Sequence, residues 1–264
     1  MDLKLTGKLT LVTGSTAGIG LGIATALAAE GVRVIINGRT AARVEEASAQ
    51  IRKAHPNAQL LPFPLDLSKP EGANEATHKF PELDILVNNL GVYEPKPFEE
   101  ITDADWEAII DTNFMSGVRL ARHYLPRMRF EDWGRILFIS SESAVNIPAE
   151  MIHYGVTKTM QVALARGLAE TTAGTGVTVN SVLVGPTRSE GVEVFVQDLA
   201  KAKNITPAQV EEEFFKTMRP GSLLQRFETP EEVAAMVAFL CSPLASATNG
   251  AAIRVEGGVL RTIL

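Results

Sequence analysis

Short, nearly continuous apolar runs alternate along the chain with longer amphipathic stretches. Runs rich in β-branched residues are typical of strands, and a strand that is apolar at almost every position is covered on both faces. The amphipathic stretches between them have helical length. We therefore expect strands at 9–13, 32–37, 59–65, 84–89, 134–140, 177–184 and 251–256, and helices at about 18–30, 41–54, 70–79, 103–129, 150–170 and 229–241.

The alternation of strand and helix predicts the fold class. Strand–helix–strand units make right-handed crossovers, and successive crossovers build a parallel sheet with helices on both faces. We expect an α/β fold with a doubly wound sheet of seven parallel strands. No repeat and no linker rich in Gly, Ser or Pro divides the sequence, so we expect residues 1–264 to form a single domain.

One segment interrupts this alternation, because residues 187–228 separate the sixth strand from the next helix. Within it, "TPAQVEEEFFKTM" (206–218) is amphipathic, with Thr206 as the N-cap and Pro207 in the first turn. Loops at the carboxyl ends of parallel strands are where such sheets bind ligands. We therefore expect this insertion to be a substrate lid.

Composition narrows the classes of function. A net charge of −6 and a pI near 5.4 argue against an extended nucleic-acid surface or a docking site for anionic membranes. The single cysteine, Cys241, excludes an intramolecular disulfide framework, and the 4 histidines do not suggest a structural metal. The sequence has no apolar run of membrane-spanning length, and "MDLKLTGK" at its start does not resemble a signal peptide. We expect a cytoplasmic protein without metal, membrane or nucleic-acid partners.

A glycine-rich turn separates the first strand from the first helix. The sequence "TGSTAGIG" (13–20) has glycines at 14, 18 and 20. Glycine has no β-carbon, so a pyrophosphate can approach the backbone, and the helix start offers unpaired N–H groups and a positive dipole end. A strand before this turn and a second strand by residue 32 favour a dinucleotide site over an ordinary turn.

The motif "YGVTK" (154–158) places Tyr154 and Lys158 one helical turn apart on the same face. A fixed ammonium about 4 Å from a phenol, at an effective dielectric near 20, is worth roughly 4 kcal/mol, or about three pKa units. We therefore expect Lys158 to bring the pKa of Tyr154 close to neutrality, which would suit this phenol for acid–base catalysis. The spacing alone is common on helices, so its meaning depends on its partners.

Taken in order, these motifs resemble the short-chain dehydrogenase/reductase family of Rossmann-type oxidoreductases, whose glycine pattern is T-G-x-x-x-G-x-G. The resemblance extends from Thr6 to "VEGG" (255–258). It implies that Ser141 in "ISSES" binds the substrate carbonyl, and that Asn113 in "DTNFMSG" kinks its helix and holds a water for a proton relay. The catalytic set that it implies is Asn113, Ser141, Tyr154 and Lys158.

The resemblance also implies which cofactor is bound. An NAD site would need an acidic residue where Gly38 stands, whereas the guanidinium of Arg39, which follows, can pair with a 2′-phosphate. The family's other NADP signal, a basic residue at position 17, is replaced by Ala17. We expect NADP(H), with NAD(H) as the alternative.

Further contacts with the cofactor follow from the same resemblance. Asp66 would meet the adenine ring or, alternatively, cap the next helix, and Asn88 would join neighbouring backbone segments. Leu90 and Val184 depart from the alanine and the proline that the family has at these positions. The residues expected to bind the cofactor are Gly14, Ser15, Thr16, Gly18, Ile19, Gly20, Arg39, Asp66, Leu67, Asn89, Gly91, Tyr154, Lys158, Gly185, Thr187 and Ser189.

The function that follows is hydride transfer between NADP(H) and a carbonyl compound or secondary alcohol. The nearest general resemblance is to 3-oxoacyl-carrier-protein reductases, for which a cluster of arginines could dock the acidic carrier: Arg119, Arg122, Arg127 and Arg129. A dehydrogenase of a sugar, polyol or other small alcohol is the alternative, and a nucleotide-binding regulator without activity is a third hypothesis. Members of the family usually form dimers or tetramers, so we expect a homo-oligomer.

Overall fold

A computed structural model describes residues 1–263 of the chain. One sheet contains seven strands in the order β3-β2-β1-β4-β5-β6-β7, and every neighbouring pair is parallel. This order confirms the predicted doubly wound α/β fold. The strands are β1 (Leu9–Val12), β2 (Arg33–Gly38), β3 (Leu60–Pro64), β4 (Ile85–Asn88), β5 (Gly134–Ile139), β6 (Val177–Val184) and β7 (Ala252–Val255).

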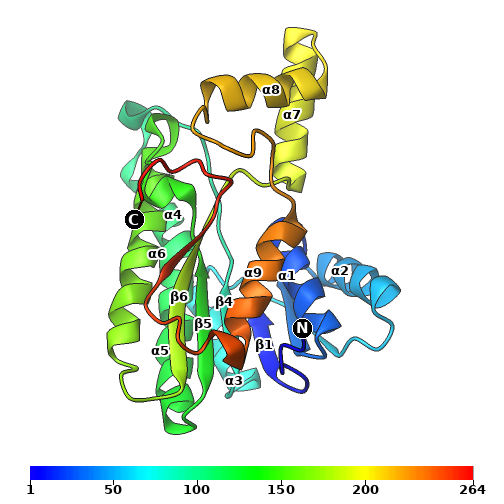
Figure 1. Cartoon of the computed structure of the whole chain (residues 1–264), viewed down its shortest axis with the longest axis vertical. Coiled ribbons are helices and arrows are strands. Elements are labelled where there is room, and N and C mark those ends of the chain that lie inside the picture. Colours follow the sequence, from blue (N-terminus) through cyan, green and yellow to red (C-terminus); the bar gives the residue numbers. More distant parts are fainter. Residues whose placement is uncertain (264) are drawn as a thin grey trace.

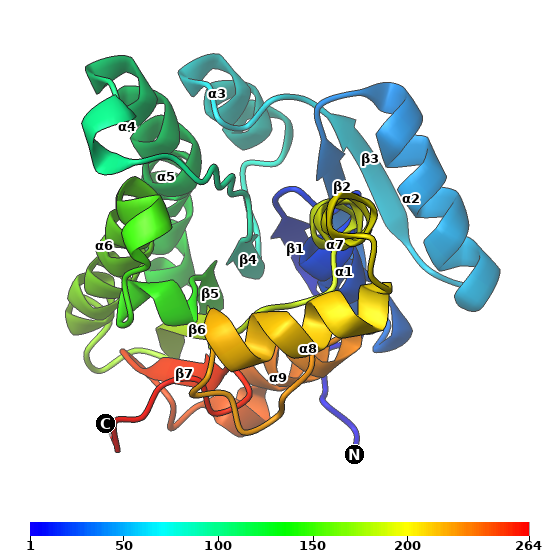
Figure 2. The same ribbon diagram turned by 90° about the horizontal axis from the view of Figure 1, so that it is seen from above.

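Helices connect the strands and cover both faces of the sheet (Figures 1 and 2). Within residues 1–263, none of them has both the length and the apolar character needed to cross a lipid bilayer. The helices are α1 (Gly18–Ala29), α2 (Ala41–Ala54), α3 (Pro70–Lys79), α4 (Asp103–Ile110), α5 (Ser116–Phe130), α6 (Ile152–Glu170), α7 (Glu190–Lys203), α8 (Pro207–Thr217) and α9 (Pro230–Cys241).

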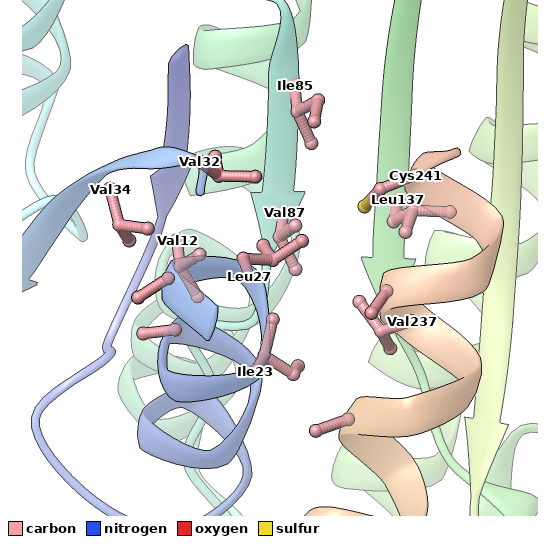
Figure 3. Packing of buried hydrophobic residues seen from close by; sticks show 14 of the residues in the cluster. Val12, Ile23, Leu27, Val32, Val34, Ile85, Val87, Leu137, Val237 and Cys241 are labelled. Carbon is pink, nitrogen blue, oxygen red and sulfur yellow. The ribbon is translucent and has the colours of Figure 1, made fainter. Parts of the chain in front are cut away.

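Successive strand side chains enter two different cores, one on each face of the sheet. Val12, Ile23 of α1 and Val237 of α9 belong to one of these cores, part of which Figure 3 shows. Leu11, the neighbour of Val12, points the other way, into a core that contains Tyr124 of α5. Burial on both faces is the physical reason why the strands read as continuous apolar runs.

The helix expected at 103–129 is interrupted at its centre. α4 ends at Ile110, a π-helical turn spans Asp111–Met115, and α5 begins at Ser116. Such turns are rare and are frequent at functional sites. The turn contains Asn113, which is buried. The irregularity expected at Asn113 is therefore present.

The 187–228 segment contains two helices beyond the carboxyl ends of the strands (Figure 1). α8 follows the predicted cap, because the Thr206 hydroxyl accepts a hydrogen bond from the Gln209 N–H (3.3 Å). The sequence pattern does not predict α7, since its first turns are rich in valine, a residue typical of strands. Phe215 and Phe227 belong to a small core of this segment, distinct from the two cores of the sheet.

Candidate active site

Four of the predicted motifs follow the carboxyl ends of strands, whereas Asn113 and the Tyr154–Lys158 motif lie on helical segments. The glycine-rich turn follows β1, Asn89 follows β4, Ser141 lies just beyond β5, and Gly185 follows β6. All strands of the sheet are parallel, so these ends lie along one edge. This edge is where open α/β sheets bind their ligands.

Glycine is required at three positions of the turn after β1. Gly14 and Gly18 have φ angles of +62° and +51°, which favour glycine over residues with a β-carbon. At Gly20 an added β-carbon would lie 2.5 Å from Nδ2 of Asn89 and closer still to the carbonyl oxygen of Gly14. The turn is therefore held tightly against the start of α1, with its backbone free of side chains.

Two asparagines hold this turn in place. Asn37 accepts a hydrogen bond from the Gly14 N–H (3.1 Å) and donates to the carbonyl oxygens of Phe63 and Leu65. Asn89 donates from Nδ2 to the carbonyl oxygens of Thr13 (2.9 Å) and Gly14 (3.2 Å). Sequence reasoning missed Asn37, although a buried polar residue inside an apolar strand is itself a signal that it bonds to the backbone.

The side chains of two residues expected to bind the cofactor point into the protein, and the role expected of Asn88 is wrong. Ser15 is fully buried, and its hydroxyl accepts a hydrogen bond from the Asn37 N–H (2.9 Å), so it faces the protein rather than a cofactor. Leu67 packs into the core that contains Tyr124. Asn88 does not join neighbouring backbone segments, because its buried amide has no hydrogen-bond partner among residues 1–263. Asn89 has this role instead.

Arg39 follows β2 and Asp66 comes shortly after β3, at the same edge of the sheet. Asp66 does not cap α3, since Lys69 occupies the N-cap position. Its carboxylate instead accepts a hydrogen bond from the Ser68 N–H (3.0 Å). Burial alone would raise the pKa of Asp66, but the hydrogen bonds from Ser68 and the charge of Arg39 bring it below the ordinary value. Arg39 is therefore close to Asp66 and exposed to solvent.

Ser141 and Tyr154 come together at the end of β5. Ser141 is buried, and its hydroxyl accepts a hydrogen bond from the Ser143 N–H (3.1 Å). The interaction of the same hydroxyl with the Tyr154 hydroxyl acts to lower the pKa of Tyr154. The Tyr93 ring lies edge-on to the Tyr154 ring, with centroids 6.2 Å apart. Sequence reasoning missed Tyr93, which follows the "NNLG" motif by two residues.

The expected lowering of the Tyr154 pKa is wrong. Burial raises the pKa of Tyr154 to about 12, and the interaction with Ser141 only partly opposes this. Lys158 does not offset the burial, because its Nζ lies 5.6 Å from the ring centroid and donates to the carbonyl oxygen of Ile139 (2.8 Å). Burial also lowers the pKa of Lys158 to about 8.

A buried network connects Lys158 with Asn113. Lys158 Nζ donates to Oε1 of Gln161 (3.4 Å), and Gln161 donates to the carbonyl oxygen of Asn113 (2.5 Å). Asn113 Nδ2 donates to the Thr157 hydroxyl (3.1 Å), which in turn donates to the carbonyl oxygen of Tyr154 (2.7 Å). The structure therefore brings the four predicted catalytic residues into one region. Gln161 lies one turn after Lys158 on α6, a spacing that could have identified it.

The loop after β6 lies against the glycine-rich turn. A β-carbon on Gly18 would lie 3.3 Å from Cβ of Ser189, whose hydroxyl caps α7 by accepting from the Val192 N–H. The Thr187 hydroxyl donates to the carbonyl oxygen of Gly185 (2.9 Å). Beneath this loop lies Glu228, whose Oε1 would be 2.6 Å from a β-carbon on Gly185.

Glu228 makes folding stability depend on pH. Burial raises its pKa from the usual 4.5 to about 7, so the folded chain binds more protons than the unfolded chain between these pH values. The stability that it contributes is present below pH 4.5 and is lost as the pH rises through 7. From pH 5.5 to 8 we expect the wild type to lose about 2 kcal/mol of unfolding free energy relative to Glu228→Gln.

Urea unfolding at these two pH values measures this difference directly. Glu131→Gln, at an exposed glutamate just after α5, controls for the loss of one carboxylate and should follow the wild type. An identical pH dependence for the wild type and Glu228→Gln would contradict the assignment.

Comparisons with known proteins agree with this geometry. A family model described as enoyl-(acyl carrier protein) reductase matches residues 14–260. The chain is 48% identical over 263 residues to the uncharacterized oxidoreductase YvaG of Bacillus subtilis, covering 100% of both chains. It is 33% identical to the 3-oxoacyl-[acyl-carrier-protein] reductase FabG of Aquifex aeolicus, covering 98% of this chain and 100% of the relative.

A solved structure matches the whole chain as well. L-Sorbose reductase from Gluconobacter frateurii, complexed with NADPH and L-sorbose, superposes with a TM-score of 0.93 at 30% identity, covering 100% of both chains. The matches in sequence, fold and motif order all support membership of one family. The chain belongs to the short-chain dehydrogenase/reductase family of oxidoreductases.

Proposed function

We propose that this chain is an NADP(H)-dependent reductase that transfers hydride between the nicotinamide and a carbonyl or secondary alcohol. The observation that carries the proposal is the convergence of Ser141, Tyr154, Lys158 and Asn113 at the edge that also carries the glycine-rich turn. The NADPH bound by L-sorbose reductase supports the choice of cofactor.

The residues of the edge fit such a cofactor. Gly14 and Gly18 leave a cradle without β-carbons beside the N-terminus of α1, where a pyrophosphate would be held. Arg39, exposed beyond β2, would pair with the 2′-phosphate. NADPH, when bound, supplies the hydride. The protein residues then supply position, hydrogen bonds and a proton.

In carbonyl reduction, Tyr154 donates the proton to the oxygen of the substrate. A pKa of about 12 keeps this phenol protonated at neutral pH, so the donor is ready before each turnover. The alkoxide that forms is more basic than a phenolate, which makes the transfer favourable. The Ser141 hydroxyl binds the same oxygen and orients it toward the phenol.

Lys158 and Asn113 support this proton transfer. With a pKa of about 8, Lys158 carries a positive charge at neutral pH. We propose that this ammonium turns to the nicotinamide ribose when NADPH binds, and that from there it stabilises the phenolate left after the transfer. Asn113 is held by both hydrogen bonds to Val92, with its Oδ1 accepting from the N–H (2.8 Å). A β-carbon on Gly91 would lie 3.4 Å from Lys158 Nζ and 3.6 Å from Asn113 Oδ1, so these two residues flank one small space. We propose that this space holds the relay water.

Turnover of a panel of ketones, aldehydes and secondary alcohols with NADPH and NADP⁺ tests the proposal. We expect reduction of at least one ketone with NADPH at a rate well above that with NADH. Tight binding of NADPH without turnover of any carbonyl would overturn the proposal and favour a regulator.

Two of the arginines proposed to dock an acyl-carrier partner already have carboxylate partners on this chain. Of the four arginines expected to dock it, Arg119 pairs with Asp111 (2.5 Å) and Arg127 pairs with Glu82. The charges of these two arginines are thus partly neutralised by carboxylates of the same chain.

Assembly into a dimer or tetramer stays a prediction. It is supported by the 85% exposure of Phe130 at the end of α5, and light scattering measures the oligomeric state.

Arg39 sets the preference for the phosphorylated cofactor. A charge-assisted hydrogen bond is worth roughly 1.5–3 kcal/mol, so we expect Arg39→Gln to weaken NADPH binding by about 10- to 100-fold. NADH binding should change by less than about twofold, because NADH has no group for Arg39 to hold. Fluorescence titration measures both affinities. Arg33→Gln, at the opposite end of β2, is the matched control. Equal weakening for NADPH and NADH would contradict the role of Arg39.

A further inference from the structure

A buried ion pair lies next to the catalytic serine. Glu142 directly follows Ser141 and is 2% exposed, and Arg219, from the 187–228 segment, is 8% exposed. Arg219 Nε donates to Oε1 of Glu142 at 2.7 Å. A second carboxylate, that of Glu150, lies 3.7 Å from Arg219 Nη1 and is more exposed. The pair thus connects the 187–228 segment to the end of β5.

One oxygen of this pair has no partner. Oε1 of Glu142 accepts from Arg219 and from the Ser143 hydroxyl (3.3 Å), whereas Oε2 is buried and accepts no hydrogen bond from residues 1–263. A buried acceptor without a donor costs roughly 1–3 kcal/mol. Folding gains little from a buried ion pair that is half satisfied, so this oxygen indicates a function rather than stability.

The 3₁₀ turn Glu142–Ala144 packs against α6, the helix that carries Tyr154. Burial is the main reason why the pKa of Tyr154 is raised, but the charges of Glu142 and Arg219 also act on it, in opposite directions. Both side chains are therefore close to the phenol. Glu142 is also the residue after Ser141, so it lies at the same end of β5 as the serine that would bind the substrate carbonyl.

The charges around this oxygen restrict what it can accept. A cationic group on the substrate would meet the Arg219 guanidinium, and an anionic group would meet the Glu142 carboxylate, with Glu150 beside them. A neutral hydroxyl is repelled by neither charge, and it can donate the hydrogen bond that Oε2 of Glu142 lacks. A plain alkyl ketone or an alkyl thioester would leave Oε2 unpaired.

We propose that the substrate is a neutral hydroxylated carbonyl compound, a hydroxyketone or the corresponding polyol, and that Glu142 recognises a hydroxyl one or two carbons from the reacting carbonyl. This inference rests on the reductase function proposed above. It selects the sugar or polyol alternative over the acyl-thioester one. Arg219 is the positioning residue, because it fixes the Glu142 carboxylate through Oε1 and leaves Oε2 for the substrate.

Matched ketone pairs test this assignment. Hydroxyacetone and butanone differ by one hydroxyl in place of a methyl at the carbon next to the carbonyl, and 4-hydroxybutan-2-one and pentan-2-one differ in the same way one carbon further. A site built around a hydroxyl rejects the analogue that lacks it, so we expect kcat/KM to favour the hydroxylated member of at least one pair by about 100-fold or more. This measurement needs no variant.

The variant Glu142→Gln tests whether Glu142 causes the preference for the hydroxylated ketone. The amide retains an acceptor for Arg219 and places a neutral NH₂ where the carboxylate oxygen stood, so the preference should fall by at least about tenfold. Glu150→Gln removes the other carboxylate beside Arg219 and should leave the preference within about twofold of the wild type, because Oε2 of Glu142 is untouched.

The outcomes separate this inference from the function on which it rests. Wild-type turnover of both members of each pair at similar kcat/KM would overturn the role of Glu142 and leave the reductase function intact. An unchanged preference in a folded Glu142→Gln variant would overturn it as well. Failure to reduce any carbonyl compound with NADPH would instead overturn the proposed function.

Discussion

Tyr154→Phe is expected to lower kcat for carbonyl reduction by about a thousandfold or more, because general acid catalysis contributes up to roughly 10⁴-fold and the Ser141 hydroxyl, which binds the same oxygen, is a weaker acid than a phenol. The ring keeps its place beside Tyr93, so the shape of the site is preserved. Binding of NADPH should change by less than about twofold, because the substitution removes one oxygen at the chemical end of the site. Single-turnover kinetics and fluorescence titration measure the two effects separately.

Tyr124→Phe is the matched control for this experiment. Tyr124 is also buried, and its hydroxyl donates to the carbonyl oxygen of Phe80 (2.9 Å), in the core far along α5 from the site. Its loss should reduce stability slightly and leave kcat unchanged. Near-normal activity of Tyr154→Phe would remove Tyr154 from the mechanism, and an equal loss in both variants would show that the effect is structural.

Gly20→Ala is expected to weaken NADPH binding by about 100-fold or more, since the added methyl group cannot fit without displacing the phosphate cradle. The β-carbon would lie 2.5 Å from Nδ2 of Asn89 and closer to the carbonyl oxygen of Gly14, and neither group is free to move. Asn89 is held by its two hydrogen bonds to Thr13 and Gly14. The turn must therefore open, which separates its N–H groups from the start of α1.

Gly167→Ala is the control for the added methyl group. Gly167 lies on α6, where an added β-carbon would meet no atom within 4 Å. Its NADPH affinity should stay within about twofold of the wild type, since the change is remote from the turn. Isothermal titration of both variants, with circular dichroism to establish that they are folded, gives the comparison. Wild-type NADPH affinity in Gly20→Ala would contradict the proposal that the glycine-rich turn holds the pyrophosphate.

Local pattern was sufficient to predict the sheet and most of the helices. The strands are apolar on both faces because two cores bury them, and Thr206 and Pro207 mark the start of α8 by themselves. The sequence does not predict α7, because its valines suggest a strand and because Ser189, its N-cap, also fits the cofactor-binding pattern of the family. Tertiary packing against α8 decides the conformation there.

The sequence predicts which residues form the candidate site better than it predicts their pKa values. The positions of Ser141, Tyr154 and Lys158 follow from their spacing, but the balance between burial and charge does not. Lys158 turns its ammonium to the carbonyl oxygen of Ile139, a strand residue that sequence spacing cannot pair with it. Glu142 and Arg219 are 77 positions apart, so only the fold brings them together.

The most direct test of the central claim is a crystal structure of the chain with NADPH bound. We predict that the hydroxyl of Tyr154 lies within about 3.2 Å of the Ser141 hydroxyl and faces C4 of the nicotinamide, with Lys158 Nζ reaching the adjoining ribose. A phenol turned away from the nicotinamide, with its oxygen out of hydrogen-bonding reach of Ser141, would contradict the mechanism.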